Sequence, residues 1–208
     1  MSRLARTALR WLAWVAYPAL AGAGFVVLAL GVVTWLPALA AMADTLRAWR
    51  RDGEERCFLG VFVAFPRYLR TLLPHAVVST VVTALLAVDI VFLLGRPEPV
   101  AFLLLCGVVG LGGVFVLYHL GLAVAAACCP EGGPDVWRRR ALVLAFGSPR
   151  RTVAWLASVV AAPVLSLPVP FGPLLLGPSL PILVGLAFDG RHPSTPHRQN
   201  GRWRVGGS

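Results

Sequence analysis

Long apolar runs alternate with short arginine-rich segments along this chain. Uncharged runs occupy residues 11–43, 72–88, 100–127 and 152–188. A helix needs about 20 apolar residues to cross the hydrocarbon core of a bilayer. Only helices and closed barrels satisfy all their backbone hydrogen bonds there. The pattern therefore predicts an all-α fold, a polytopic helical bundle in a membrane.

Two of these runs predict single crossings joined by a short outer turn. Residues 72–94 and 100–127 flank the turn at residues 95–99, which holds one arginine and one glutamate. The run at 152–188 is interrupted by prolines and a glycine at 168–173. Because proline and glycine break helices, this run predicts a helical hairpin with two crossings.

The first run, residues 11–43, is longer than one crossing and shorter than two. Its break at Gly31 and at residues 35–37 predicts that residues 11–33 cross and residues 37–49 return as a short helix. Pro37 suits the first turn of such a helix, and neighbouring helices must shield its exposed end. The prediction is five long spans plus one short return helix.

The charged segments set the direction of the spans. Residues 44–71 hold six arginines, and a second basic segment covers residues 131–151. Short arginine-rich loops stay on the cytoplasmic side. We therefore expect both segments and both termini in the cytoplasm of a bacterial cell, Arg96 outside, and the protein in the cell's inner membrane.

Both basic segments contain a predicted helix at the inner membrane surface. Residues 58–73 predict an amphipathic interfacial helix that feeds the next span, with a kink or restart at Pro66. Residues 136–146 predict a second short helix. The arginines expected at this interface are Arg67, Arg70, Arg138, Arg150 and Arg151.

The domain prediction is a single membrane domain over residues 1–188. Residues 189–208 contain arginines, histidines, glycines and prolines without an apolar stripe. Such a composition cannot bury a core, so this basic tail is predicted to be disordered in the cytoplasm.

Composition supports a membrane protein and argues against nucleic acid. The chain is 58% hydrophobic and 13% charged, and its net charge of +10 comes from arginine without lysine. The arginines lie in short clusters beside apolar runs, so anionic lipid headgroups are the expected partners. The four cysteines form no C-x-x-C pair and no histidine lies at zinc-finger spacing, so no metal site is predicted.

Few residues could carry chemistry. No nucleophile elbow, zinc-protease motif or glycine-rich phosphate loop occurs, so neither an enzyme nor a cofactor is predicted. The candidate intramembrane polar residues are Asp89, His75 and His119. His75 and His119 both lie roughly 30 Å along their helices from the outer turn, near the inner surface, so they are expected to be neighbours.

Asp89 is the one acid inside the apolar runs. Intramembrane ionisable residues mark ion or substrate paths, but Asp89 lies only about 9 Å from the outer end of its helix. The sequence leaves two interpretations of Asp89 open: a functional carboxylate, or one that extends into outer water. We expect Asp89 to face the bundle or outer water, with Arg96 as a candidate partner, and we disfavour a relay with His119.

Several short stretches carry a family resemblance. They are LPALAA at 36–41, LRAW at 46–49, YLR at 68–70, VD at 88–89, RRAL at 139–142 and PRR at 149–151. Their order resembles the YesL-like family of bacterial integral membrane proteins, up to about residue 188. Leu36 stands where that pattern usually has glycine. The resemblance implies a multi-pass membrane protein of unestablished activity. It also raises the expectation that the protein accompanies carbohydrate uptake systems.

Two functions are compatible with these predictions. The first is a transport-associated protein, either an accessory subunit of a transport complex or a small permease for solutes such as carbohydrates. The alternative is a structural or regulatory membrane protein whose basic cytoplasmic segments dock a soluble partner or anionic lipid.

Overall fold

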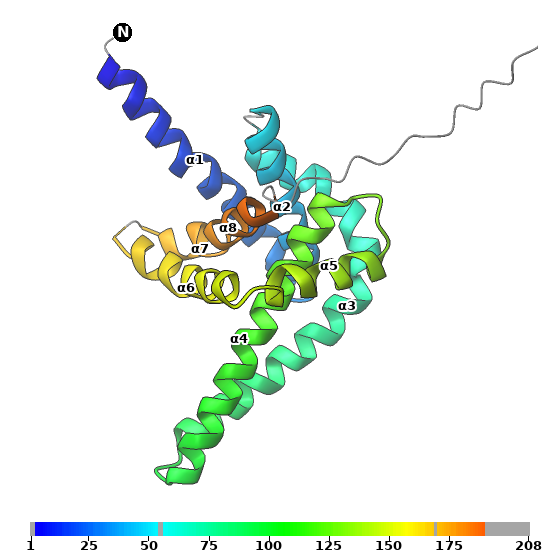
Figure 1. Cartoon of the computed structure of the whole chain (residues 1–208), viewed down its shortest axis with the longest axis vertical. Helices are drawn as coiled ribbons and strands as arrows, with labels where there is room; N and C mark the ends of the chain where they lie inside the picture. The colour runs from blue at the N-terminus through cyan, green and yellow to red at the C-terminus, as the bar shows by residue number, and fades with distance from the viewer. Residues whose placement is uncertain (1–2, 54–55, 169, 190–208) are drawn as a thin grey trace, which may run out of the picture.

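The computed structural model describes residues 3–53, 56–168 and 170–189, and of residues 3–11 the backbone alone. In this part of the chain every regular element is a helix (Figure 1), which confirms the predicted all-α class. The predicted tail beyond Asp189 lies outside the described residues. The helices are α1 (Arg3–Ala29), α2 (Trp35–Asp52), α3 (Cys57–Leu94), α4 (Pro99–Cys128), α5 (Pro134–Phe146), α6 (Pro149–Ser166), α7 (Gly172–Leu176) and α8 (Ser179–Asp189).

Helix α2 lies at the centre of the molecule, packed against α1, α3, α4 and α8. Pro37 fits its first turn, and an alanine-rich stretch favours the helix that follows. Arg50 and Arg51 in the last turn complement the helix dipole. Gly53 ends the helix with φ +70° and donates its N–H to the Trp49 carbonyl. The residues buried along α2 include Leu36, Ala38, Ala40, Ala41, Met42, Ala43 and Leu46.

Helix α2 runs back alongside α1. The rings of Trp14 and Trp49 lie 5.0 Å apart at their centroids, and Tyr17 also contacts Trp49. The first half of α1 therefore lies beside the last turns of α2. The predicted short helix at 37–49 exists, and neighbouring helices shield it, as its length requires.

Helix α3 differs from the prediction. The expected interfacial helix at 58–73 and the expected span at 72–94 form one helix of 38 residues, so a restart of the helix at Pro66 is wrong, whereas a kink there stays a prediction. Pro66 and Pro74 each remove one backbone hydrogen bond, but both are exposed on the helix surface and the turns around them continue. At 1.5 Å per residue the helix is about 57 Å long.

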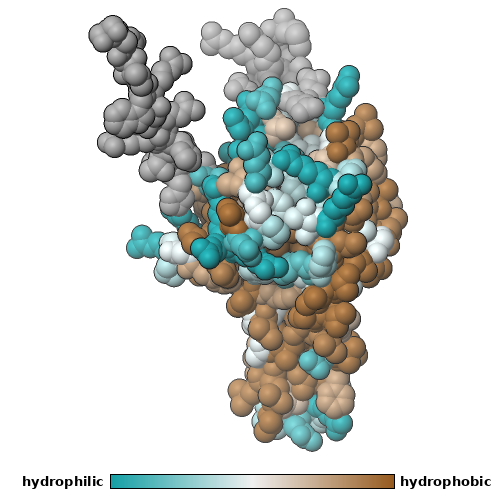
Figure 2. Space-filling view, turned by 90° about the vertical axis from the view of Figure 1, so that its right-hand side faces the viewer, coloured by the Kyte–Doolittle hydropathy of each residue, from teal (hydrophilic) through white to brown (hydrophobic). Residues whose placement is uncertain are grey.

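Helices α3 and α4 form a long hairpin closed by the turn at residues 95–98. Their inner faces repeat every three or four residues, as in Leu86, Ile90 and Leu93 of α3 and Leu105 and Val108 of α4. Most other side chains in the outer half of the hairpin point outward. Figure 2 shows this half as a brown stalk with hydrophilic residues at the tip. Side chains that are more than half exposed include Leu85, Val88, Val91, Phe92, Leu103, Leu104 and Val109.

The C-terminal helices pack on the side of this bundle. The helix predicted at 136–146 is confirmed as α5. Helix α6 and the pair α7–α8 form the two arms predicted for 152–188. The Trp155 indole of α6 is fully buried and donates to the Pro181 carbonyl of α8 over 2.8 Å, which holds the arms together.

Four stretches are long and apolar enough to cross a membrane: Leu12–Ala29, Cys57–Leu94, Pro99–Cys128 and Gly172–Asp189. This is one fewer than the five predicted long spans. Helix α6 is the arm that falls short, because Arg150 and Arg151 occupy the first turn of its 18 residues. Its remaining apolar part is shorter than the bilayer core.

Candidate functional site

The two predicted histidines are neighbours, as expected from their depth. The rings of His75 on α3 and His119 on α4 stack with centroids 5.5 Å apart and planes 27° apart. Tyr118 and Phe115 of α4 and Trp35 of α2 also contact the His119 ring. The pair therefore lies where the α3–α4 hairpin meets the first turn of α2.

His119 is 2% exposed and both ring nitrogens have partners. Nδ1 lies 2.8 Å from the Phe115 carbonyl oxygen and Nε2 lies 2.7 Å from the Ser79 hydroxyl. A carbonyl can only accept, so Nδ1 carries the proton and donates, and Nε2 accepts from Ser79. The neutral ring is fully satisfied in this arrangement, which is what a structural histidine between two helices requires.

His75 differs in having an unused nitrogen. Its Nε2 is buried and has no hydrogen-bond partner among the described residues. The ring lies edge-on to Tyr118, 5.9 Å between centroids, and on the other side it stacks on His119. Of the two predicted histidines, His75 is the one with hydrogen-bonding capacity left for a ligand or water.

A cleft of about 510 Å³ opens beside His119. Its hydroxyl groups are already engaged: Thr80 accepts from the Trp35 indole over 3.1 Å and donates to Ala76, and Thr83 donates to Ser79. The cleft can hold an apolar group, but it presents no acid–base or nucleophilic pair. Its lining is Phe25, Val32, Trp35, Leu39, Thr80, Thr83, Ala84, Ala87, Phe115, Val116, His119 and Leu120.

Asp89 lies apart from this cluster, on the outer half of the hairpin. Its side chain is exposed, so the expectation that it faces the bundle is wrong, and outer water or a partner remains. The structure shows no ion pair between Asp89 and any described residue. The Arg96 guanidinium lies over the Phe92 ring, 4.9 Å from its centroid. The candidate pair Asp89–Arg96 is therefore not formed.

The five predicted interface arginines are spread over three helices rather than gathered in one site. Arg67 and Arg70 are exposed on α3, and the Arg67 guanidinium lies 5.9 Å from the Tyr68 ring. Arg138 forms an exposed 3.5 Å ion pair with Asp135 on α5. Arg150 and Arg151 lie in the first turn of α6. This distribution fits a basic surface rather than a binding pocket.

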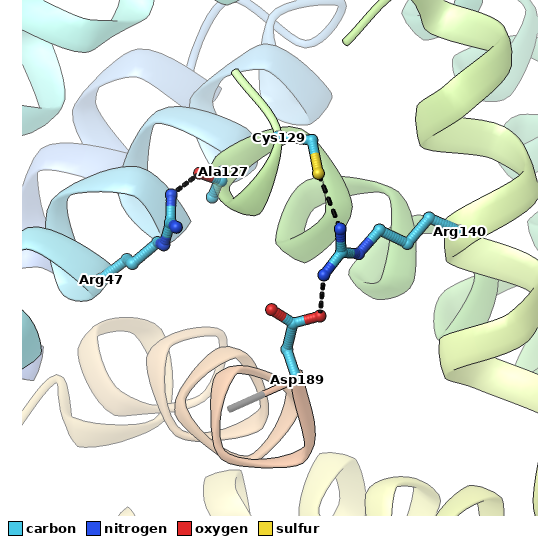
Figure 3. Close-up of polar contacts among 5 residues, drawn as sticks. All are labelled: Arg47, Ala127, Cys129, Arg140 and Asp189. Atoms are coloured by element: carbon cyan, nitrogen blue, oxygen red, sulfur yellow. Dashed lines mark hydrogen bonds and ion pairs between the residues drawn. The ribbon is translucent and has the colours of Figure 1, made fainter. Parts of the chain in front are cut away.

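A second polar cluster joins the ends of α2, α4 and α8 to the middle of α5 (Figure 3). Arg140 donates to Asp189 over 2.5 Å and to the Cys129 sulfur over 2.7 Å. Arg47 donates to the Ala127 carbonyl over 2.6 Å. Burial works to lower the pKa of Arg140, but the hydrogen bond and charge of Asp189 outweigh it and the pKa is raised. The ion pair thus fixes the end of α8 against α5.

Sequence reasoning missed this cluster. The partners are 49 residues apart for Arg140 and Asp189 and 80 apart for Arg47 and Ala127. One available signal was that Asp189 is the first charge after the long uncharged run, where a helix end returns to the polar surface.

Beside the ion pair lies a cleft of about 260 Å³, lined by Arg47, Arg50, Arg51, Cys128, Leu186 and Asp189. Asp44 lies one turn before Arg47 on α2. Burial raises the pKa of the Asp44 carboxyl above 3.8, and the neighbouring Tyr68 hydroxyl and the charges of Arg67 and Arg47 oppose the rise. The described residues contain no group of three or more metal-ligating side chains.

No family model, curated protein or solved structure matches this chain. Its function must therefore be argued from the sites themselves.

Proposed function

We propose that this chain is an accessory subunit of a solute-transport system in the bacterial inner membrane, rather than a permease on its own. One observation carries the proposal. The outer half of the α3–α4 hairpin exposes apolar side chains on all sides except the seam between its two helices. Unlike α2, it has few covering neighbours within the chain, so it is suited to pack against helices of another membrane protein.

The distribution of polar groups favours an accessory role over a permease. Solute paths through membranes are lined by polar or ionisable residues. In the described spans, His75, His119, Ser79 and Thr80 gather at one end of the hairpin, and His119, Ser79 and Thr80 bond to one another or to backbone. Further out the only ionisable side chain before the turn is Asp89, which is exposed. A continuous polar path is not supported.

The contacts at helix ends support a topology with both termini in the cytoplasm. If the turn at residues 95–98 lies outside, α4 ends inside, and the Arg47–Ala127 bond brings the end of α2 to the same face. The Trp14–Trp49 contact then brings the first half of α1 there. The Arg140–Asp189 ion pair brings the end of α8 to this face too. In this proposal α2 returns, and α6 with α7–α8 enters and leaves by one face.

The resemblance to the YesL-like family stays part of this proposal. The expectation of a role in carbohydrate uptake comes from this resemblance, and the growth of a deletion strain tests that role. Growth of that strain on a panel of single carbon sources should be impaired on at least one sugar and restored by the wild-type chain. Normal growth on every sugar would contradict a role in carbohydrate transport.

A matched pair of variants tests the hairpin itself. Leu103 on the hairpin and Leu165 on α6 are both about three-quarters exposed, at 70% and 75%. Leu103→Trp should weaken rescue of the deletion strain because it disturbs a helix–helix contact, whereas Leu165→Trp should not. Equal rescue at equal membrane abundance would count against the hairpin as the contact surface.

A further inference from the structure

An arginine-lined cleft at the ends of α2, α4 and α8 lies apart from the outer half of the α3–α4 hairpin on which the proposed function rests. On α2, Arg50 and Arg51 follow Arg47 by three and four residues, so all three side chains project from one side of its last turns. Leu186 and Asp189 of α8 and Cys128 of α4 close the other side. The cleft therefore collects three guanidinium groups in a small volume.

Among the described residues that line this cleft, arginines outnumber carboxylates. Asp189 is the one carboxylate among the lining residues, and Arg140, which is outside the lining, binds it over 2.5 Å. The ion pair engages Asp189, and Asp44, whose charge interacts with Arg47 one turn away, does not line the cleft. Among the described residues, the lining therefore holds three arginines and one carboxylate that is already paired. Clustered like charges in a partly enclosed cleft attract a counter-ion.

Two of the arginines donate hydrogen bonds to backbone carbonyls of neighbouring helices. Arg47 donates one N–H to the Ala127 carbonyl at the end of α4, and Arg50 donates one to Leu183 of α8 over 3.4 Å. A guanidinium has five N–H donors, so each retains four. The Arg47 contact satisfies a carbonyl left over at the C-terminus of α4, and both contacts orient their arginine side chains before any ligand arrives.

The size of the cleft limits which ligands it can bind. A cleft of about 260 Å³ is below the usual range of roughly 300–1,000 Å³ for drug-sized ligands, so a single anionic group fits better than a nucleotide. The planar fork of arginine matches phosphate oxygens. We propose that Arg47, Arg50 and Arg51 bind a phosphate group, carried either by an anionic phospholipid headgroup or by free phosphate.

Binding to the purified full-length chain in detergent tests the proposal and separates the two sources. The probes are inorganic phosphate, with chloride at equal ionic strength as its control, and dioctanoylphosphatidylglycerol, with dioctanoylglycerol lacking the phosphate as its control. Saturable binding of the phospholipid without inorganic phosphate identifies a headgroup site, and the reverse identifies a free-phosphate site. Either result supports the site, whereas binding of neither probe overturns it.

Single-charge variants show whether the cleft is responsible. Arg51 forms no hydrogen bond or ion pair with the described residues outside its own backbone, so Arg51→Gln should leave the fold intact. It should weaken binding about tenfold, the effect of losing one charge-assisted contact. Arg50→Gln should act similarly. Arg139→Gln on α5, outside the cleft, removes the same charge and should change affinity less than about twofold.

The matched control decides the outcome. If Arg139→Gln weakens binding as much as Arg51→Gln, the interaction reflects overall charge and the proposal fails. The proposal also fails if the Arg50→Gln, Arg51→Gln double variant binds as wild type does. The melting temperature of each variant without ligand establishes that folding is preserved.

Discussion

The first half of helix α2 and the outer half of the α3–α4 hairpin are both apolar helical stretches, but they occupy opposite environments. In α2, Ala38, Ala40, Ala41 and Ala43 are fully buried, while the hairpin exposes valines, leucines and phenylalanines. Small residues let helices approach closely in membranes, whereas large apolar residues are as well solvated by lipid as by protein. The comparison teaches that hydrophobicity alone does not mark the centre of this bundle, because the alanine-rich α2 is buried and the more hydrophobic hairpin is exposed.

The largest expected effect contrasts two leucines of these regions. Leu46 of α2 is fully buried and Leu103 of the hairpin is 70% exposed. Leu46→Ala should lower the free energy of unfolding by about 2–5 kcal/mol because it leaves a cavity. Leu103→Ala should change it by less than about 0.5 kcal/mol. Equilibrium unfolding in mixed micelles measures both, and equal costs would remove the distinction between the core and the exposed apolar surface.

A pair of glycines on α4 sharpens the same contrast. A Cβ added at Gly121 would lie 2.9 Å from the Ala141 carbonyl oxygen of α5, whereas at Gly110 it would meet nothing within 4 Å. Gly121→Ala should cost about 1–3 kcal/mol through overpacking. Gly110→Ala should be neutral or stabilising by up to about 1 kcal/mol through helix propensity. Thermal unfolding of both variants in one detergent compares them, and similar melting temperatures would contradict the α4–α5 packing.

Two arginines of α5 extend the comparison to charges. Arg140 bonds Asp189, whose side chain is 16% exposed, whereas Arg138 pairs with an Asp135 that is 86% exposed. Arg140→Gln should cost about 1–3 kcal/mol because it leaves a half-buried carboxylate without its partner. Arg138→Gln should cost less than about 1 kcal/mol. Unfolding by denaturant checks both values, and an equal loss would argue against the interhelical role of the Arg140–Asp189 pair.

These contrasts define what could be predicted from the sequence. Hydropathy identified the helical class and four of the five predicted long spans as stretches long and apolar enough to cross a membrane, and Pro37 marked the start of α2. It did not identify α2 as the centre, because alanine is weakly hydrophobic and burial depends on which helices surround it. Pro66 suggested a kink or restart in α3, but the helix continues through this exposed proline without a restart. The Arg140–Asp189 pair depends on tertiary proximity, which no local pattern contains.

The smallest effect concerns pH and the buried end of α2. Because burial raises the folded-state pKa of Asp44 above 3.8, its contribution to stability is fully present below that value. It is lost as the pH rises through the folded-state pKa. Asp44→Asn should therefore raise the melting temperature slightly near pH 7, and the difference should disappear near pH 3.8. A variant that is less stable than wild type at pH 7 would show that the charges of Arg47 and Arg67 outweigh burial.

The central claim is that the α3–α4 hairpin crosses the bilayer while the ends of α2, α4 and α8 meet at the cytoplasmic face. Reporter fusions test it most directly, with alkaline phosphatase and a fluorescent protein joined in turn after residues 2, 97, 135 and 205. Our account predicts a periplasmic signal at 97 and cytoplasmic signals at 2, 135 and 205. A periplasmic signal at 2 would contradict the return of α2, and a cytoplasmic signal at 97 would contradict the crossing hairpin on which the account rests.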